Sequence, residues 1–342
     1  MNAKRITALA LALVMTLLLA ACGSKTVVND DGTKTEQTER GVKVTQTAAK
    51  AVQTEKYETA DFSMTIPKGW TVTTGGTNIY HSIRVYDPAE PLNQMFVLLK
   101  ADVLLHSQAG KEAWQQNYSM GNTQAALFTK AAVLDNPSTE GFFKIFSQYT
   151  AFASEVEPAY SGYAFPQFND FTVTDRYPSA SPMKSSALGD EQLRATFTDN
   201  GKEGEGLFAA SVVDFGSFAI SNGNVVGYQL QAVDGGYYMA YNIVAVTAAK
   251  DTFIEWEGVL TDCFKTLQYS DSFVSATNQA SNEKVALAQQ ISQNFNATMD
   301  GFMSSWDSRN RSQDSMSRKR PAKFTRLRTV LPMSTTASGT RQ

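Results

Sequence analysis

The chain has 342 residues, of which 42% are hydrophobic and 18% are charged, and its formal net charge is −3. This composition supplies enough apolar surface for a buried core, so it excludes a wholly disordered or a collagen-like chain. Two cysteines and two histidines exclude a disulfide framework, a cysteine-rich zinc site and most histidine-based chemistry. The length suits one large domain or two small ones.

Residues 1–22 have the pattern of a secretory signal: Lys4 and Arg5 precede an apolar run from Ile6 to Leu19. This run is shorter than the roughly 20 apolar residues that span a membrane, so we expect cleavage. The run ends in Leu19-Ala20-Ala21-Cys22, which resembles the lipobox of bacterial lipoproteins. The resemblance implies that the Cys22 sulfur receives a diacylglycerol and that Cys22 begins the mature protein. The alternative is an ordinary signal peptide with an incidental cysteine.

Residues 23–55 are rich in Thr, Lys, Glu and Gln, and the first aromatic residue after them is Tyr57. Such a stretch cannot bury enough apolar surface to offset the entropy lost on ordering. We therefore predict a disordered tether between the lipid and a globular domain. Because two acyl chains hold a protein stably on a bilayer, the expected location is the extracytoplasmic face of the cell membrane. The Gram type of the envelope stays open.

Strand patterns begin at Asp61, where Phe62, Met64 and Ile66 alternate with polar residues. Pro67-Lys68-Gly69 predicts a turn, and the alternation that resumes at Trp70 predicts a hairpin. Further strands are predicted at 79–86, 95–100, 171–176, 193–198, 207–214, 225–233 and 237–247. Glycine-rich or Asn-Gly turns at 201–206, 222–223 and 235–236 separate the last four, which indicates an antiparallel meander.

Three helices are predicted within the same region. Ser107 is a candidate N-cap for a helix that carries Trp114 and Tyr118, and a second helix is predicted over 139–153. Thr252 and Glu255 have capping-box spacing before one apolar stripe, which consists of Phe253, Trp256, Leu260, Cys263, Phe264 and Leu267. We expect Cys263 to be an inert packing residue of that stripe.

Residues 276–315 form a candidate amphipathic helical region, because apolar residues recur at steps of three and four over 282–306. That apolar face could pack on the protein's own sheet or dock on a partner. The segment 316–342 differs from the rest, since residues 317–342 hold seven Lys and Arg and no acid. Three interpretations stay open for it: a basic arm that binds anionic surfaces, a disordered tail, or the product of a frameshift near residues 313–320.

A family resemblance covers about residues 56–270. The opening strand, the Ile66-Pro67-Lys68-Gly69-Trp70 turn, the meander and the closing helix resemble the PsbP-like α/β/α sandwich, whose members are mostly non-catalytic binding or assembly factors. The resemblance implies an α+β domain over 56–275, with a central antiparallel sheet covered by helices. Met95–Trp114 and Ser304–Asp314 are similar to bacterial lipoproteins of unknown function, which implies no activity.

The favoured functional hypothesis is a lipid-anchored, non-catalytic binding or assembly module for an unknown envelope protein or ligand. We assign no catalytic, cofactor-binding or metal-ligating residue, and we expect His81 and His106 to be ordinary core or surface histidines. The acidic globule and the extracytoplasmic address disfavour nucleic acid as a partner. The alternative is a cell-envelope hydrolase that uses clustered carboxylates, namely Asp190, Glu191, Glu203 and Glu205.

Overall fold

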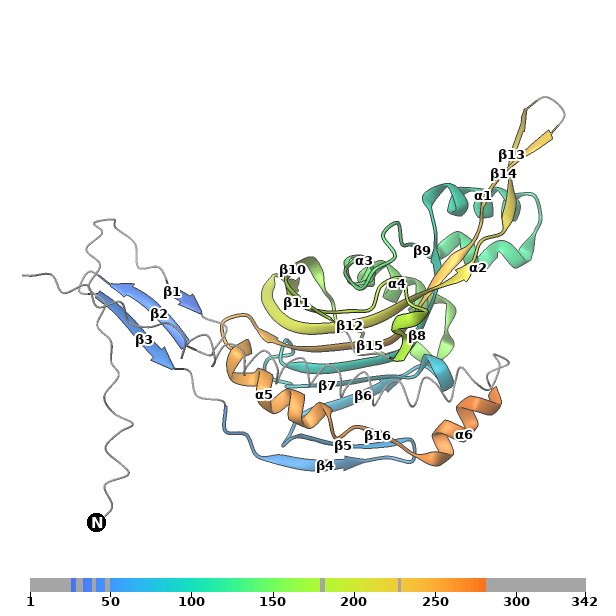
Figure 1. Ribbon diagram of the computed structural model, residues 1–342. Coiled ribbons are helices and arrows are strands. Elements are labelled where there is room, and N and C mark those ends of the chain that lie inside the picture. The colour runs from blue at the N-terminus through green and yellow to red at the C-terminus, as the bar shows by residue number, and fades with distance from the viewer. Residues whose placement is uncertain are drawn as a thin grey trace, which may run out of the picture.

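The computed structural model describes residues 50–178, 182–226 and 229–280, together with three short strands between residues 26 and 46. Cys22, the helix expected over 282–306 and the tail at 316–342 lie outside these residues. What we expect of them therefore stays a prediction. The described chain has an α+β fold with a large antiparallel sheet and several helices (Figure 1).

The main sheet has eight strands, and all of its pairings are antiparallel except that of β9 with β8. Its order is β10 (Asn169–Pro178), β11 (Glu191–Asp199), β12 (Lys202–Gly216), β15 (Tyr237–Ala249), β8 (Gln94–Leu105), β7 (Ser82–Tyr86) and β6 (Thr71–Gly75), with β9 (Ala132–Val133) beside β8. β10 therefore stands at one end of the sheet and β6 stands at the other.

Three smaller sheets accompany it. They are β16 (Gln268–Tyr269), β5 (Phe62–Pro67) and β4 (Thr54–Glu58); the ribbon of β13 (Ala219–Val226) and β14 (Gln229–Asp234); and β1 (Thr26–Val28), β2 (Thr33–Thr38) and β3 (Gly41–Gln46). β1 to β3 pair with one another inside the segment expected to lack regular structure, so the backbone there differs from our expectation. The role of this segment as a tether stays a prediction.

Helices lie on both faces of the main sheet. α3 (Thr139–Lys144) contacts β10, β11 and β12, whereas α5 (Phe253–Phe264) contacts β15, β12, β8 and β5. Figure 1 shows α3 and α4 on one side of the sheet and α5 with β4 and β5 on the other. The other helices are α1 (Gln108–Ser119), α2 (Ala126–Lys130), α4 (Phe146–Val156), α6 (Asp271–Ala280), η1 (Asn78–Tyr80), η2 (Thr123–Ala125), η3 (Pro158–Tyr160) and η4 (Pro182–Ser185).

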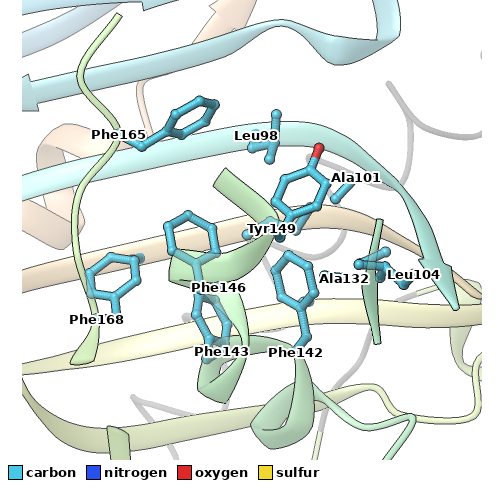
Figure 2. Packing of buried hydrophobic residues seen from close by; sticks show 14 of the residues in the cluster. Leu98, Ala101, Leu104, Ala132, Phe142, Phe143, Phe146, Tyr149, Phe165 and Phe168 are labelled. Carbon is cyan, nitrogen blue, oxygen red and sulfur yellow. The ribbon is translucent and has the colours of Figure 1, made fainter. Parts of the chain in front are cut away.

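Phenylalanine dominates the core under α3 and α4. Phe143 packs edge-to-face on Phe208 of β12 with ring centroids 4.9 Å apart, and Phe146 packs in the same way on Phe96 of β8 at 5.6 Å. Figure 2 shows Phe143 and Phe146 grouped with Phe142, Phe165 and Phe168 in this cluster. Burial of each such side chain contributes about 1.5–3 kcal/mol, so this cluster anchors α3 and α4 firmly.

The core on the opposite face carries the apolar stripe of α5. Phe253, Trp256, Leu260, Cys263 and Phe264 are all buried, as the periodicity predicts. The capping-box prediction is wrong, because the side chain of Thr252 donates its hydrogen bond to the carbonyl of Ala249 instead of accepting one from the first turn. The preceding strand ends at Ala249 and thereby offers Thr252 a nearer partner.

Lys50, at the start of the globular domain, contacts α5. The amide of Lys50 donates to the carbonyl of Glu255 at 2.9 Å, and its ammonium lies 4.6 Å from the ring centroid of Trp256. Trp256 in turn packs against Trp70 at 5.3 Å. Lys50 is therefore fixed to the domain four residues before β4 begins.

Two predicted pairings are wrong. The turn at Gly69 has the expected positive φ of 82°, yet β5 pairs with β4 and β16 while β6 pairs with β7. The chain thus crosses between sheets where we expected a hairpin. The strand expected over 225–233 is instead the hairpin of β13 and β14, which leaves β12 to pair directly with β15.

The helix predicted over 139–153 is two helices. It breaks at Ile145, whose φ of −101° and ψ of 6° are not helical, and the halves are α3 and α4. The prediction for α1 is confirmed, because the Ser107 hydroxyl accepts a hydrogen bond from the Gly110 amide at 3.1 Å.

Candidate functional site

A groove of about 460 Å³ runs along β10 at the end of the main sheet. Glu140 and Lys144 of α3 form one wall, and residues 171–176 of β10 form the other. The α3 wall is positioned by Phe142 and Phe143, which are buried on the same helix. The groove therefore lies between a firmly packed helix and a strand that ends the sheet in the described part of the chain.

Ion pairs line this groove. Arg176 contacts Glu140 and lies 2.5 Å from a carboxylate oxygen of Glu191, while Lys144 lies 2.7 Å from Glu140. Hydrogen bonds from Lys144 and then Arg176 hold the pKa of Glu140 below its ordinary value, although partial burial opposes this shift. Because Arg176 and Lys144 are about half exposed, water screens these pairs, and each adds little to stability.

The backbone of β10 is the second feature of the groove. Its described pairing is with β11 alone, and its register shifts between Asn169 and Thr172 and again between Val173 and Asp175. A strand at a sheet edge presents backbone donors and acceptors to which an extended peptide can add as a further strand. The groove thus combines a backbone template with charged side chains of both signs.

The four carboxylates of the hydrolase hypothesis are not brought together. Glu205 lies 2.6 Å from Arg194, and Glu203 lies 3.0 Å from Lys250. Glu205 is paired in register with Thr196 of β11. Thr196 lies five residues from Glu191 along the same strand, a distance of about 17 Å at about 3.4 Å per residue.

The other two acids lie at the Glu191 end. Glu191 pairs with Arg176, and Asp190 accepts a hydrogen bond from the Ser211 hydroxyl at 2.9 Å. Hence the four carboxylates do not converge on one point in the described geometry.

The two histidines have opposite surroundings. His81 is buried among the rings of Phe62, Tyr269 and Phe273, and this burial lowers its pKa to about 4, although Asp61 acts in the opposite direction. His106 lies between two carboxylates, those of Asp214 and Asp234. In the residues that the structure describes, no group of three or more His, Cys, Asp and Glu is placed to hold a metal ion.

Cys263 packs as predicted. Its side chain is buried in the stripe of α5, and burial, with a contribution from Asp262, raises the pKa of its thiol to about 11. The thiolate is the reactive form of cysteine, so the raised pKa makes this thiol unreactive at neutral pH.

Comparisons with protein-family models and with curated proteins find no match to this chain. Among the helices within the described ranges, none combines the length and the apolar character needed to cross a bilayer.

Proposed function

We propose that this protein is a lipid-anchored extracytoplasmic module that binds an envelope partner without catalysing a reaction. The lipobox-like sequence at Cys22 supports the anchor, and the PsbP-like resemblance, with helices on both faces of an antiparallel sheet, supports a binding or assembly role. The observation that carries the binding role is the groove along β10. We propose that its ligand is an extended polypeptide segment of the partner.

The chemistry of the groove favours an extended chain over a compact small molecule. Main-chain groups of a sheet edge give affinity to any strand, and neighbouring side chains give specificity. Arg176 and Lys144 can pair with acidic side chains of the ligand, while Glu140 can pair with basic ones. The register shifts of β10 make its edge irregular, and an irregular edge disfavours non-specific pairing with other strands.

Metabolic labelling tests the anchor. Cells that express the protein are grown with a clickable fatty acid, and we expect the wild-type protein to be labelled and the Cys22→Ser variant to remain unlabelled. A wild-type protein without label, or a mature form that begins at another residue, would overturn the lipoprotein assignment while leaving the groove untouched.

Site-specific photocrosslinking tests the groove. A photoreactive residue at exposed Thr172 in β10 should give a discrete adduct on intact cells, and one at Lys68, in the exposed turn after β5, should not. The adduct should weaken severalfold in an Arg176→Gln background and persist with Lys184→Gln, a change at an exposed lysine of η4. The absence of an adduct at Thr172, or equal adducts at both positions, would overturn the binding role of this groove.

A further inference from the structure

His106 joins two strands at the point where the ribbon of β13 and β14 leaves the main sheet. Its Nδ1 lies 2.8 Å from Oδ2 of Asp234, at the end of β14, and its Nε2 lies 3.1 Å from Oδ1 of Asp214, near the end of β12. We call these three side chains the clasp. Only 8% of the His106 side chain is exposed, so water competes little for its two ring nitrogens.

Further bonds hold both carboxylates in place. Asp214 accepts the amide of Gly216 at 2.8 Å, while Asp234 accepts the amide of Gly236 at 2.8 Å and the hydroxyl of Ser217 at 3.1 Å. The site is built tightly, because a Cβ at Gly236 would lie 2.2 Å from the carbonyl oxygen of Gly216 and 2.8 Å from the imidazole. The two carboxylates are therefore aimed at the ring from opposite sides.

Only one protonation state of His106 lets both ring nitrogens donate hydrogen bonds to the two carboxylates. A carboxylate oxygen can only accept hydrogen bonds, so both ring nitrogens must donate, and only the imidazolium carries two N–H groups. In the neutral ring one nitrogen turns a lone pair toward a carboxylate, and that contact becomes repulsive.

Three titratable groups face the ring from the packed strands: Asp214 of β12, Asp234 of β14 and Tyr238 of β15, whose ring centroid is 4.0 Å away. The pKa of Asp234 is lowered: partial burial opposes the shift, but hydrogen bonds from His106, Gly236 and Ser217 outweigh it. Burial, followed by the charges of Asp214 and Asp234, raises the pKa of Tyr238, so this phenol stays neutral. Asp234 and Tyr238 therefore do not change their charge near neutral pH.

We propose that protonation of the clasp controls how firmly the main sheet holds the hairpin lobe, which we define as α1, β13 and β14. With His106 charged, the lobe is fastened at both strands. When His106 loses a proton, the longer contact, to Asp214, opens, and β12 is released from β14. The lobe is held more firmly at acidic pH than at alkaline pH.

The lobe responds as a unit because α1 is bonded to the ribbon. The indole N–H of Trp114 donates to the carbonyl of Gly235 at 3.0 Å, and the amide of Asn117 donates to the carbonyl of Ser221 at 2.8 Å. α1 begins directly after His106, at the Ser107 N-cap. Opening of the clasp therefore loosens α1 and the ribbon together.

Hydrogen–deuterium exchange on the full chain tests the proposal. Protection factors, which correct for the intrinsic effect of pH on exchange, are measured for backbone amides of β13 and β14 at pH 5.5 and pH 8. We expect protection to fall about tenfold at pH 8, as for the loss of one partly exposed charge-assisted hydrogen bond. His81 stays neutral across this window, since its pKa is about 4.

The variant Asp214→Asn separates the mechanism from general loosening. The asparagine amide can donate to Nε2 while Nδ1–H donates to Asp234, so the neutral ring satisfies both partners. Protection in this variant should stay at its acidic level up to pH 8, and in His106→Gln it should be equal at both pH values. Equal protection of the wild-type lobe at pH 5.5 and 8, or a pH response in Asp214→Asn like that of the wild type, would overturn the proposal.

Discussion

The surroundings of the two histidines show how one residue type acquires opposite chemistry in one domain. His81 is buried among aromatic rings, and loss of hydration disfavours its charged form, so its pKa is lowered to about 4. His106 lies between Asp214 and Asp234, and its two contacts are both satisfied only by a charged ring. Acid should therefore destabilise the region around His81, whereas a charged ring at His106 satisfies both of its contacts.

The largest predicted effect is acid destabilisation through His81. Its pKa is about 4 in the folded chain against an ordinary 6.5, so the unfolded state binds more protons between these values and stability falls as pH falls. From pH 7 to pH 4 the loss amounts to about 3 kcal/mol. Urea unfolding of the wild type and of His81→Phe should show this loss only in the wild type. Parallel pH profiles of the two proteins would contradict the assignment.

A smaller effect is predicted for His106→Gln. Removal of the imidazole leaves Asp214 and Asp234 without a bridge between them, which should cost about 1 kcal/mol, a moderate value because both acids are over 40% exposed. Equilibrium unfolding in urea measures this cost. An unchanged free energy of unfolding in this variant would contradict the bridging role of His106.

The smallest predicted effect compares the two acids. Asp234 accepts hydrogen bonds from His106, Gly236 and Ser217, whereas Asp214 accepts them from His106 and Gly216. Asp234→Asn should therefore lower the free energy of unfolding by about 0.5 kcal/mol more than Asp214→Asn at pH 6. Thermal unfolding of both variants side by side is the measurement, and the reverse order would contradict the bonding described for the clasp.

Alternation and periodicity predicted most of the helices and strands but few of the strand pairings. β5, β11, β12, β15, α1 and α5 lie where the patterns place them. Alternation reports that one face of a strand is buried and says nothing about which strand lies beside it. For that reason the crossing between sheets after Gly69 was missed. The ribbon of β13 and β14 was missed because Asn222-Gly223, a strong turn signal, lies inside β13.

The candidate sites depend on long-range placement, which the sequence does not display. Asp214 and Asp234 are 108 and 128 residues from His106, so no local spacing connects them to it. The groove exists because β10 ends the strand order, and an edge strand has the same alternation as a central one. Cys263 was predictable because its role is set by its own helix.

The attachment of Lys50 to α5 has a mechanical consequence. In the lipid-anchored protein that we propose, any drag on a bound partner is transmitted to the membrane through the chain that precedes Lys50. Its bond to Glu255 and its packing on Trp256 direct this load into α5 before it reaches β4. The small sheet of β4, β5 and β16 is thereby shielded from being pulled apart strand by strand.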